Sequence, residues 1–317
     1  MGDDFVKVVI TGATSEIGIA LIKSCISRGD EIMAIVREKS TNLNRIPSSP
    51  NIRLVYSDLS ELEKAVVPNE KYDVFYHIGW MHTDKNGRLD PSLQSLNIKS
   101  SLSAVNLAEK FGCRTFVGAG SQAEYGIVEG TISSETHTNP STAYGFVKLC
   151  SYGLTKILCE EKGIRHIWCR IFSVYGVNDN RKTLVNYIVD NLLDTKPMHF
   201  SKADKKWNYL YEDDAGEMMR LLCEPNVSPG VYCIANTQSM ILREYILKIL
   251  SMFNYDYDVS DCFDNDQEMA YGLQVDIQKT IDAINYRPQI SFEEGVMRII
   301  DDRKASIRNS IHQHGIE

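Results

Sequence analysis

Short β-branched runs alternate with amphipathic stretches through the first half of the chain. Ile17, Leu21 and Cys25 recur at i, i+4 and i+8, which predicts a helix that stops at Gly29. The same reading predicts strands at 6–10, 31–36, 52–56, 74–78, 115–118 and 165–171, with longer helices over 93–111 and about 143–162. Strands joined by helical crossovers predict an α/β fold with a doubly wound parallel sheet.

The pattern becomes less regular after Gly176, where loops at 178–182, 196–206 and 254–266 separate short helices and strands. We therefore expect a Rossmann domain followed by a smaller α/β lobe on its C-terminal side, which would bind the substrate. The expected division gives residues 1–176 to the Rossmann domain, with 206–235 returning to it, and gives 177–205 and 236–317 to the lobe.

Composition narrows the class of protein. The 317 residues are 43% hydrophobic and 24% charged, as in an ordinary globular protein, and the net charge of −8 gives no general attraction for nucleic acid or anionic membranes. No apolar run approaches the ~20 residues that span a bilayer, and the N-terminus lacks the layout of a signal peptide, so we expect a cytoplasmic protein. The eight cysteines form no C-x-x-C pair and the histidines show no ligand spacing, which predicts reduced thiols and no metal.

A small-residue turn follows the first predicted strand and precedes the first predicted helix. Such a turn lets backbone N–H groups approach a pyrophosphate at the positive end of the helix, although a tight turn without a ligand is the alternative. Ser15 stands where these loops carry their middle glycine. The candidate cofactor residues here are Gly12, Thr14, Ser15, Glu16, Ile17 and Gly18.

The end of the second predicted strand bears on the choice of cofactor. Asp or Glu at this edge binds the ribose 2′-hydroxyl of NAD, whereas here the strand ends in Ile35-Val36-Arg37. A guanidinium fits a 2′-phosphate, so Arg37 favours NADP(H), with NAD(H) possible. The alternative for Arg37 is a solvated surface side chain.

Tyr144 and Lys148 lie four residues apart on a predicted helix and so share a face. A free tyrosine hydroxyl has a pKa of about 10, and a nearby ammonium lowers it towards the range useful for proton transfer. Ser121 follows the carboxyl end of a predicted strand, which is the ligand edge of an open α/β sheet. These three residues are the candidate catalytic group.

Taken together, these motifs resemble the extended short-chain dehydrogenases/reductases that modify nucleotide sugars, the NAD-dependent epimerase/dehydratase family. The resemblance extends over nearly the whole chain. It rests on 11–18, Asp58-Leu59, His77-Ile78-Gly79, Asn97, Ser121, Tyr144-x-x-x-Lys148, 170–176, 209–215, 230–236, Tyr286-Arg287-Pro288 and 291–295.

The resemblance implies a role for each candidate. Tyr144 would be the general acid/base, Lys148 its electrostatic partner and a ribose ligand, and Ser121 the group that polarises the reacting oxygen. The resemblance places further cofactor contacts at Asp58, Leu59, Ile78 and Gly79, with Asn97 in support of the proton relay. The helices with Tyr144 and before the fifth strand would pair with their counterparts in a homodimer.

Departures from the family pattern narrow the chemistry. Relatives that dehydrate their sugar carry Asp-Glu after the Ser/Thr, whereas Gln122-Ala123 stand here. Ser173 replaces a usual asparagine, and Trp207 stands where many relatives use an arginine on the substrate phosphates. The candidate substrate residues are Trp80, Ser173, Trp207 and Arg287.

Three functions follow as expectations. The favoured one is reduction of a 4-keto-6-deoxy sugar nucleotide, with Tyr144 as the general acid. The second is C4-epimerisation of a nucleoside-diphosphate sugar with tightly bound NAD. A remote third is a cofactor-binding regulator without catalysis, which the presence of Ser121, Tyr144 and Lys148 disfavours.

Overall fold

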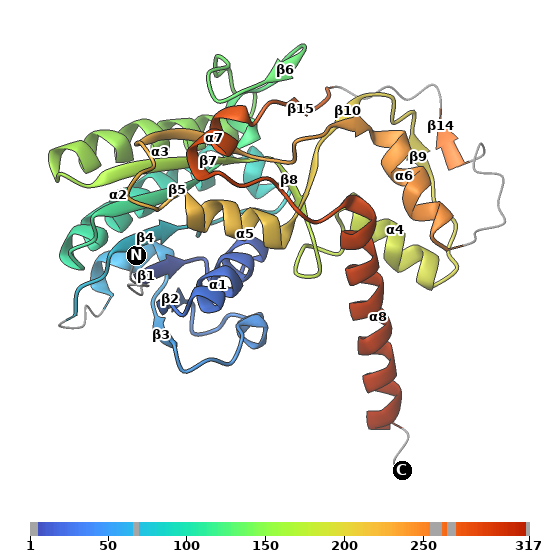
Figure 1. Ribbon diagram of the computed structural model, residues 1–317, viewed down its shortest axis with the longest axis horizontal. Helices are drawn as coiled ribbons and strands as arrows, with labels where there is room; N and C mark the ends of the chain where they lie inside the picture. The colour runs from blue at the N-terminus through green and yellow to red at the C-terminus, as the bar shows by residue number, and fades with distance from the viewer. Residues whose placement is uncertain (1–5, 66–69, 254–261, 265–270, 315–317) are drawn as a thin grey trace.

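A parallel sheet of seven strands forms the centre of the molecule (Figure 1). The computed structural model describes residues 6–65, 70–253, 262–264 and 271–314. The strands lie in the order β12 (Gly230–Ile234), β7 (Arg165–Ile171), β5 (Thr115–Ser121), β4 (Val74–His77), β1 (Lys7–Thr11), β2 (Glu31–Val36) and β3 (Ile52–Tyr56). The predicted doubly wound fold is confirmed, and β12 adds a seventh strand to the six that were predicted from the first half of the chain.

Helices cover both faces of this sheet. On one face, α1 (Glu16–Arg28) packs against α5 (Glu212–Leu221), and α7 (Gln278–Ile284) packs against β12. On the other face, α2 (Pro91–Lys110) packs against α3 (Ala143–Glu161). Because both faces are covered, the central strands are buried runs rather than alternating ones, and β5 is buried at every position.

The lobe has an apolar core of its own. Its helices are α4 (Leu184–Leu193), α6 (Leu242–Ser251) and α8 (Phe292–His314), which share a separate apolar cluster with Tyr175, Tyr209 and Tyr211. The distal part of α8 extends away from the rest of the chain (Figure 1). The lobe and its junction with the sheet also contain short strand pairs, namely β8 (Ser173–Tyr175) with β11 (Tyr209–Tyr211), β9 (Phe200–Ser201) with β14 (Phe263–Asp264), β10 (Lys206–Trp207) with β13 (Met240–Ile241) and β6 (Thr131–Ile132) with β15 (Gln274–Val275).

The domain division stays a prediction, although one segment departs from it. Residues 236–317 were assigned to the lobe, yet α7 belongs to the apolar cluster of the main sheet through Ile277, Ile281 and Ile284. This short helix belongs with the sheet because it packs against β12. The periodicity of the sequence shows that a helix has an apolar face, but it does not show which surface covers that face. Residues 254–261 and 265–270 of the predicted lobe lie outside the described residues.

The sequence also predicted reduced cysteines, no membrane span and no metal site. All eight cysteines are free thiols; five of them are buried, and Cys150 is exposed. Within the described part of the chain, no helix is both long and apolar enough to cross a membrane. No group of three or more His, Cys, Asp or Glu side chains in those same residues is arranged to hold a metal ion.

Glu124 anchors the end of β5. It closes the one-turn helix η4 (Gln122–Glu124), its side chain is fully buried, and it accepts hydrogen bonds from three donors. These are the Ser121 N–H at 2.8 Å, the Trp168 indole at 3.0 Å and the Arg170 Nε at 2.7 Å. The Trp168 ring reaches the carboxylate because Gly118 and Gly120 have no side chain, and a Cβ on Gly120 would lie 2.2 Å from the indole nitrogen.

We predict that Glu124→Ala destabilises the protein by about 3–5 kcal/mol, because it leaves the buried Arg170 guanidinium without its carboxylate. Urea unfolding measures the loss, and Glu129→Ala is the matched control, because Glu129 is exposed in the following loop. The control should stay within about 0.5 kcal/mol of the wild type. Equal unfolding midpoints for the two variants would contradict the role of Glu124 as the buried partner of Arg170.

Candidate active site

A cavity of about 640 Å³ opens at the carboxyl edge of the sheet, where the lobe faces the starts of α1 and α3. Open α/β sheets bind their ligands at this edge. Ten of the residues predicted from the sequence lie in its wall, namely Ser15, Glu16, Ile17, Ile78, Trp80, Ser121, Tyr144, Lys148, Ser173 and Trp207. The fold thus brings the predicted cofactor, catalytic and substrate residues to one place.

The turn between β1 and α1 has room for backbone only. Gly12 has φ +70°, and a Cβ there would lie 2.5 Å from the backbone nitrogen of Gly79. A Cβ on Gly18 would lie 2.3 Å from the Gly12 carbonyl oxygen. The two glycines therefore let the turn fold tightly enough to present the start of α1 to a ligand.

Ser15, the departure from the usual glycine pattern, caps α1. Its hydroxyl accepts from the Gly18 N–H at 3.1 Å and donates to the Gly12 carbonyl at 2.7 Å. The serine therefore closes the turn on itself, and it satisfies one helix N–H that a glycine would leave open. Thr14 lies on the same turn, with its hydroxyl 3.4 Å from that of Ser40.

Most of the other predicted cofactor residues follow the carboxyl ends of β2, β3 and β4, and Gly79 approaches Gly12 of the turn. A Cβ on Gly79 would lie 2.7 Å from the Leu59 side chain. Asp58 begins the short helix η2 (Leu59–Lys64) and accepts from the Ser60 N–H and hydroxyl; these bonds and the nearby Arg37 lower the pKa of its carboxyl group. Arg37 is exposed at the end of β2.

Glu16 is the first residue of α1, and its carboxyl group faces Asp179 and Glu212. Burial raises the pKa of Glu16 well above its ordinary value, and the negative charges of Asp179 and Glu212 raise it further. The surroundings of Glu16 therefore disfavour its charged form, and so oppose a negative charge next to the predicted pyrophosphate position.

Thr142 positions the tyrosine and lysine that the sequence predicts to be catalytic, because its hydroxyl accepts from the Gly145 N–H at 3.1 Å and so fixes the first turn of α3. Tyr144 lies in that turn, and Lys148 lies on the next turn of the same face. Burial raises the pKa of the Tyr144 hydroxyl, while Arg88 and a hydrogen bond with Ser121 act in the opposite direction. Tyr144 is therefore protonated at neutral pH in this structure.

Lys148 is buried, and its ammonium group has two neighbours of different kinds. Its Nζ donates to the Ala119 carbonyl at 2.6 Å and lies 3.5 Å from the centre of the Trp80 ring. Burial lowers the pKa of Lys148 to about 7. The Nζ lies 5.7 Å from the centre of the Tyr144 ring, so the lysine is close enough to act on the tyrosine electrostatically.

Asn97 has a structural role in this conformation and is absent from the cavity wall. Its side-chain oxygen accepts from the Met81 N–H at 2.7 Å, and its amide nitrogen donates to the Met81 carbonyl at 3.2 Å. One turn earlier, the buried Gln94 accepts from the Trp80 indole at 2.9 Å. Both residues of α2 therefore hold the segment that follows β4.

The lobe side of the cavity presents the N-terminus of α4. Thr183, Leu184 and Val185 line the cavity, and no side chain caps the first turn of this helix. The Thr183 hydroxyl donates instead to Asp179 and to the Asn180 carbonyl. Open N–H groups at a helix N-terminus are suited to bind the diphosphate of a ligand.

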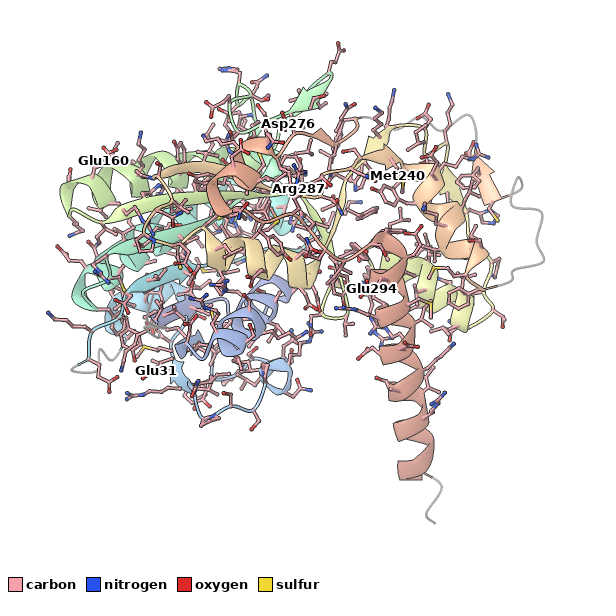
Figure 2. All side chains as sticks on the ribbon, in the orientation of Figure 1. Glu31, Glu160, Met240, Asp276, Arg287 and Glu294 are labelled. Carbon is pink, nitrogen blue, oxygen red and sulfur yellow. The ribbon has the colours of Figure 1, made fainter. Side chains whose placement is uncertain are left out.

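The structure separates the two remaining substrate candidates. Trp207 lines the cavity, with its ring centre 5.9 Å from that of Tyr271. Arg287 is exposed on the segment between α7 and α8 and is absent from the cavity wall (Figure 2). Its role in substrate binding stays a prediction.

Several residues of the wall escaped sequence analysis. Arg88 and Thr83 come from the irregular segment between β4 and α2, and Asp179 and Asn180 come from the loop before α4. Neither segment has a periodic pattern. The one available signal was position, since both follow the carboxyl ends of strands.

A glycine turn at a helix N-terminus, a Tyr/Lys pair and a serine at the strand edge are the features expected of an enzyme that binds a dinucleotide on a Rossmann fold. Residues 8–235 match the sequence model of the NAD dependent epimerase/dehydratase family. The chain belongs to that family, as its sequence motifs indicated.

Individual relatives in this family carry out different reactions. UDP-glucuronic acid decarboxylase 1 of Arabidopsis thaliana is 22% identical over all of this chain and 74% of its own length. The dTDP-6-deoxy-L-talose 4-dehydrogenase (NAD⁺) of Aggregatibacter actinomycetemcomitans is 28% identical over 67% of this chain and 73% of its own. The UDP-glucose 4-epimerase structure from Thermotoga maritima superposes with a TM-score of 0.84 at 16% identity, covering 95% of this chain and 99% of that one.

We predict that the stability of Lys148→Met relative to the wild type depends on pH. The pKa of Lys148 is about 7 in the folded protein against an ordinary 10.5. Between these values the unfolded chain binds a proton that the folded chain lacks, so the wild-type free energy of unfolding rises with pH. The free energy of unfolding of the variant minus that of the wild type should therefore fall from about pH 6 to about pH 10.

Urea unfolding across this range makes the measurement. Lys156→Met, on an exposed position of α3, is the matched control and should show no such slope. A difference for Lys148→Met that stays constant with pH would show that the amine is not desolvated.

Proposed function

We propose that the protein reduces a 4-keto-6-deoxy sugar attached to a nucleoside diphosphate, with Tyr144 as the general acid. The observation that carries this proposal is the place of Tyr144 beside Ser121 in the wall of the cavity, where burial raises the pKa of the Tyr144 hydroxyl above its ordinary value. A protonated hydroxyl at the reacting centre suits the conversion of a ketone into an alcohol. Gln122 and Ala123, which follow Ser121, offer no acid or base for dehydration.

A reduction divides the work between cofactor and protein. The dinucleotide supplies hydride to the carbonyl carbon at C4 of the sugar. Ser121 donates a hydrogen bond to the carbonyl oxygen, and Tyr144 transfers its proton to that oxygen as the alcohol forms. Lys148 stabilises the phenolate that remains, while the N-terminus of α4 binds the diphosphate.

The cofactor is a dinucleotide of the NAD type. The turn of Gly12 and Gly18 suits its pyrophosphate, because both glycines let the turn pack tightly on backbone and present the start of α1. The family description and the 28% identical relative both name NAD. Within this type of cofactor we propose NADP(H). This choice rests only on the exposed guanidinium of Arg37.

C4-epimerisation is the second candidate. The structural similarity to a UDP-glucose 4-epimerase favours it, as does the NAD in the family description. In this reaction Tyr144 would act first as a base and then as an acid, with the cofactor retained between the two steps. Cofactor content separates the two candidates, since an epimerase keeps its NAD⁺ and a reductase exchanges its cofactor.

We expect the purified protein to oxidise NADPH when supplied with dTDP- or UDP-4-keto-6-deoxyglucose, and Tyr144→Phe to lower turnover by about 10²–10⁴-fold. The matched control is Tyr152→Phe, two turns further along α3 and outside the cavity wall, which should retain most activity. The decrease in near-ultraviolet absorbance of NADPH measures the rate.

Two results would contradict the reductase. NAD⁺ that survives dialysis, together with interconversion of C4 epimers, would establish the epimerase instead. Full retention of function in Tyr144→Phe would indicate a cofactor-binding regulator.

We propose further that the protein is a homodimer built on α2 and α3. These helices expose an apolar stripe away from the sheet, with Phe146 57%, Ile157 55% and Leu96 51% exposed. Cys150 and Leu154 extend the stripe along α3. A contiguous apolar surface of this kind is typical of an interface between subunits.

Ile157→Asp should weaken this dimer by about 30-fold or more, because it buries a charge in the interface. Sedimentation velocity over a dilution series measures the dissociation constant. Ile127→Asp changes an equally exposed isoleucine that lies outside α2 and α3, and it should leave the association unchanged. A monomeric wild-type protein would refute the proposal.

A further inference from the structure

A second cation lies over the catalytic tyrosine. Arg88 is in the one-turn helix η3 (Gly87–Leu89), and its guanidinium carbon lies 4.8 Å from the centre of the Tyr144 ring. The side chain lines the cavity and is exposed to solvent at its mouth. Among the residues that the structure describes, no carboxylate forms a salt bridge with Arg88. The Tyr144 ring is therefore the contact that the structure gives to this guanidinium on the cavity side.

Hydrogen bonds fix the backbone that carries Arg88. The Asp84 carboxylate accepts from the Gly87 N–H at 3.0 Å, and the Asp84 carbonyl accepts from the Arg88 N–H at 3.0 Å. The Gln94 amide donates to the carbonyls of Gly87 at 2.9 Å and His82 at 2.8 Å. Gln94 thus holds this segment against α2 both before η3 and at its first residue, which fixes the backbone position of Arg88.

The two cations near Tyr144 differ in how firmly they hold their charge. Burial brings the pKa of Lys148 to about 7, so at neutral pH the lysine is charged only part of the time. An arginine stays protonated at every pH at which proteins fold. The buried Glu124 opposes the formation of a phenolate, whereas Arg88 and Ser121 favour it. Arg88 is therefore the permanent positive charge on this side of the tyrosine.

We propose that Arg88 is a positioning residue that stabilises the phenolate form of Tyr144. The sequence predicted this role for Lys148 alone, and Arg88 shares it. As Tyr144 releases its proton, negative charge develops on the phenolic oxygen, and the guanidinium over the ring stabilises that charge. The inference rests on the proposed function, in which Tyr144 donates a proton. It applies equally to the epimerase, in which Tyr144 would first act as a base.

The test measures the tyrosine directly and needs no sugar substrate. Spectrophotometric titration of the full chain, with and without saturating NAD⁺, follows phenolate formation in the near ultraviolet, and subtraction of the Tyr144→Phe titration isolates Tyr144. Arg88→Leu should move the midpoint of that transition upward by about one pH unit. Arg88→Lys, which keeps a positive charge at this position, should restore most of the shift.

Matched measurements separate electrostatics from structure. Arg114→Leu removes an exposed arginine far from the cavity wall and should leave the midpoint unchanged. The melting temperature and the NAD⁺ affinity of Arg88→Leu should remain those of the wild type.

Two outcomes would overturn the proposal. They are an unchanged midpoint in Arg88→Leu, and a shift accompanied by lost stability that Arg88→Lys does not rescue. If no sugar nucleotide is reduced but the midpoint shifts as expected, the proposed reaction fails and the role of Arg88 stands.

Discussion

The carboxylate of Glu124 ties the end of β5 to β7, and much of the active-site geometry follows from that connection. It holds the backbone of Ser121, the Trp168 indole and the Arg170 guanidinium in one buried network. Ser121 can present its hydroxyl to the cavity because its own N–H is fixed from behind. A buried charge is tolerated here because each of its partners is a donor and one is a cation.

The fold was largely readable from the sequence because its signals are local. The β-branched runs, the glycine turn and the four-residue spacing of Tyr144 and Lys148 each depend on neighbours along the chain, and the structure places them as predicted. The place of β12 and α7 was harder to read. Their partners are distant in sequence, and an apolar face does not indicate which surface will cover it.

The active site was readable only in part for the same reason. Ser15 interrupts the glycine pattern, yet its hydroxyl caps α1 and satisfies a helix N–H that a glycine would leave open. Arg88 and Gln94 gave no signal, because their roles depend on hydrogen bonds among backbone groups in an aperiodic segment. Asn97 holds the backbone of Met81, and its support of the proton relay stays a prediction.

The position of β12 has a consequence for synthesis of the chain. This edge strand pairs with β7, but it is translated only after α4, β11 and α5 have emerged from the ribosome. Until then β7 presents an unpaired strand edge, the kind of surface on which nascent chains aggregate. The Rossmann sheet therefore cannot be completed from consecutive segments of the chain, because α4 of the lobe must be made before the last strand of the sheet is available.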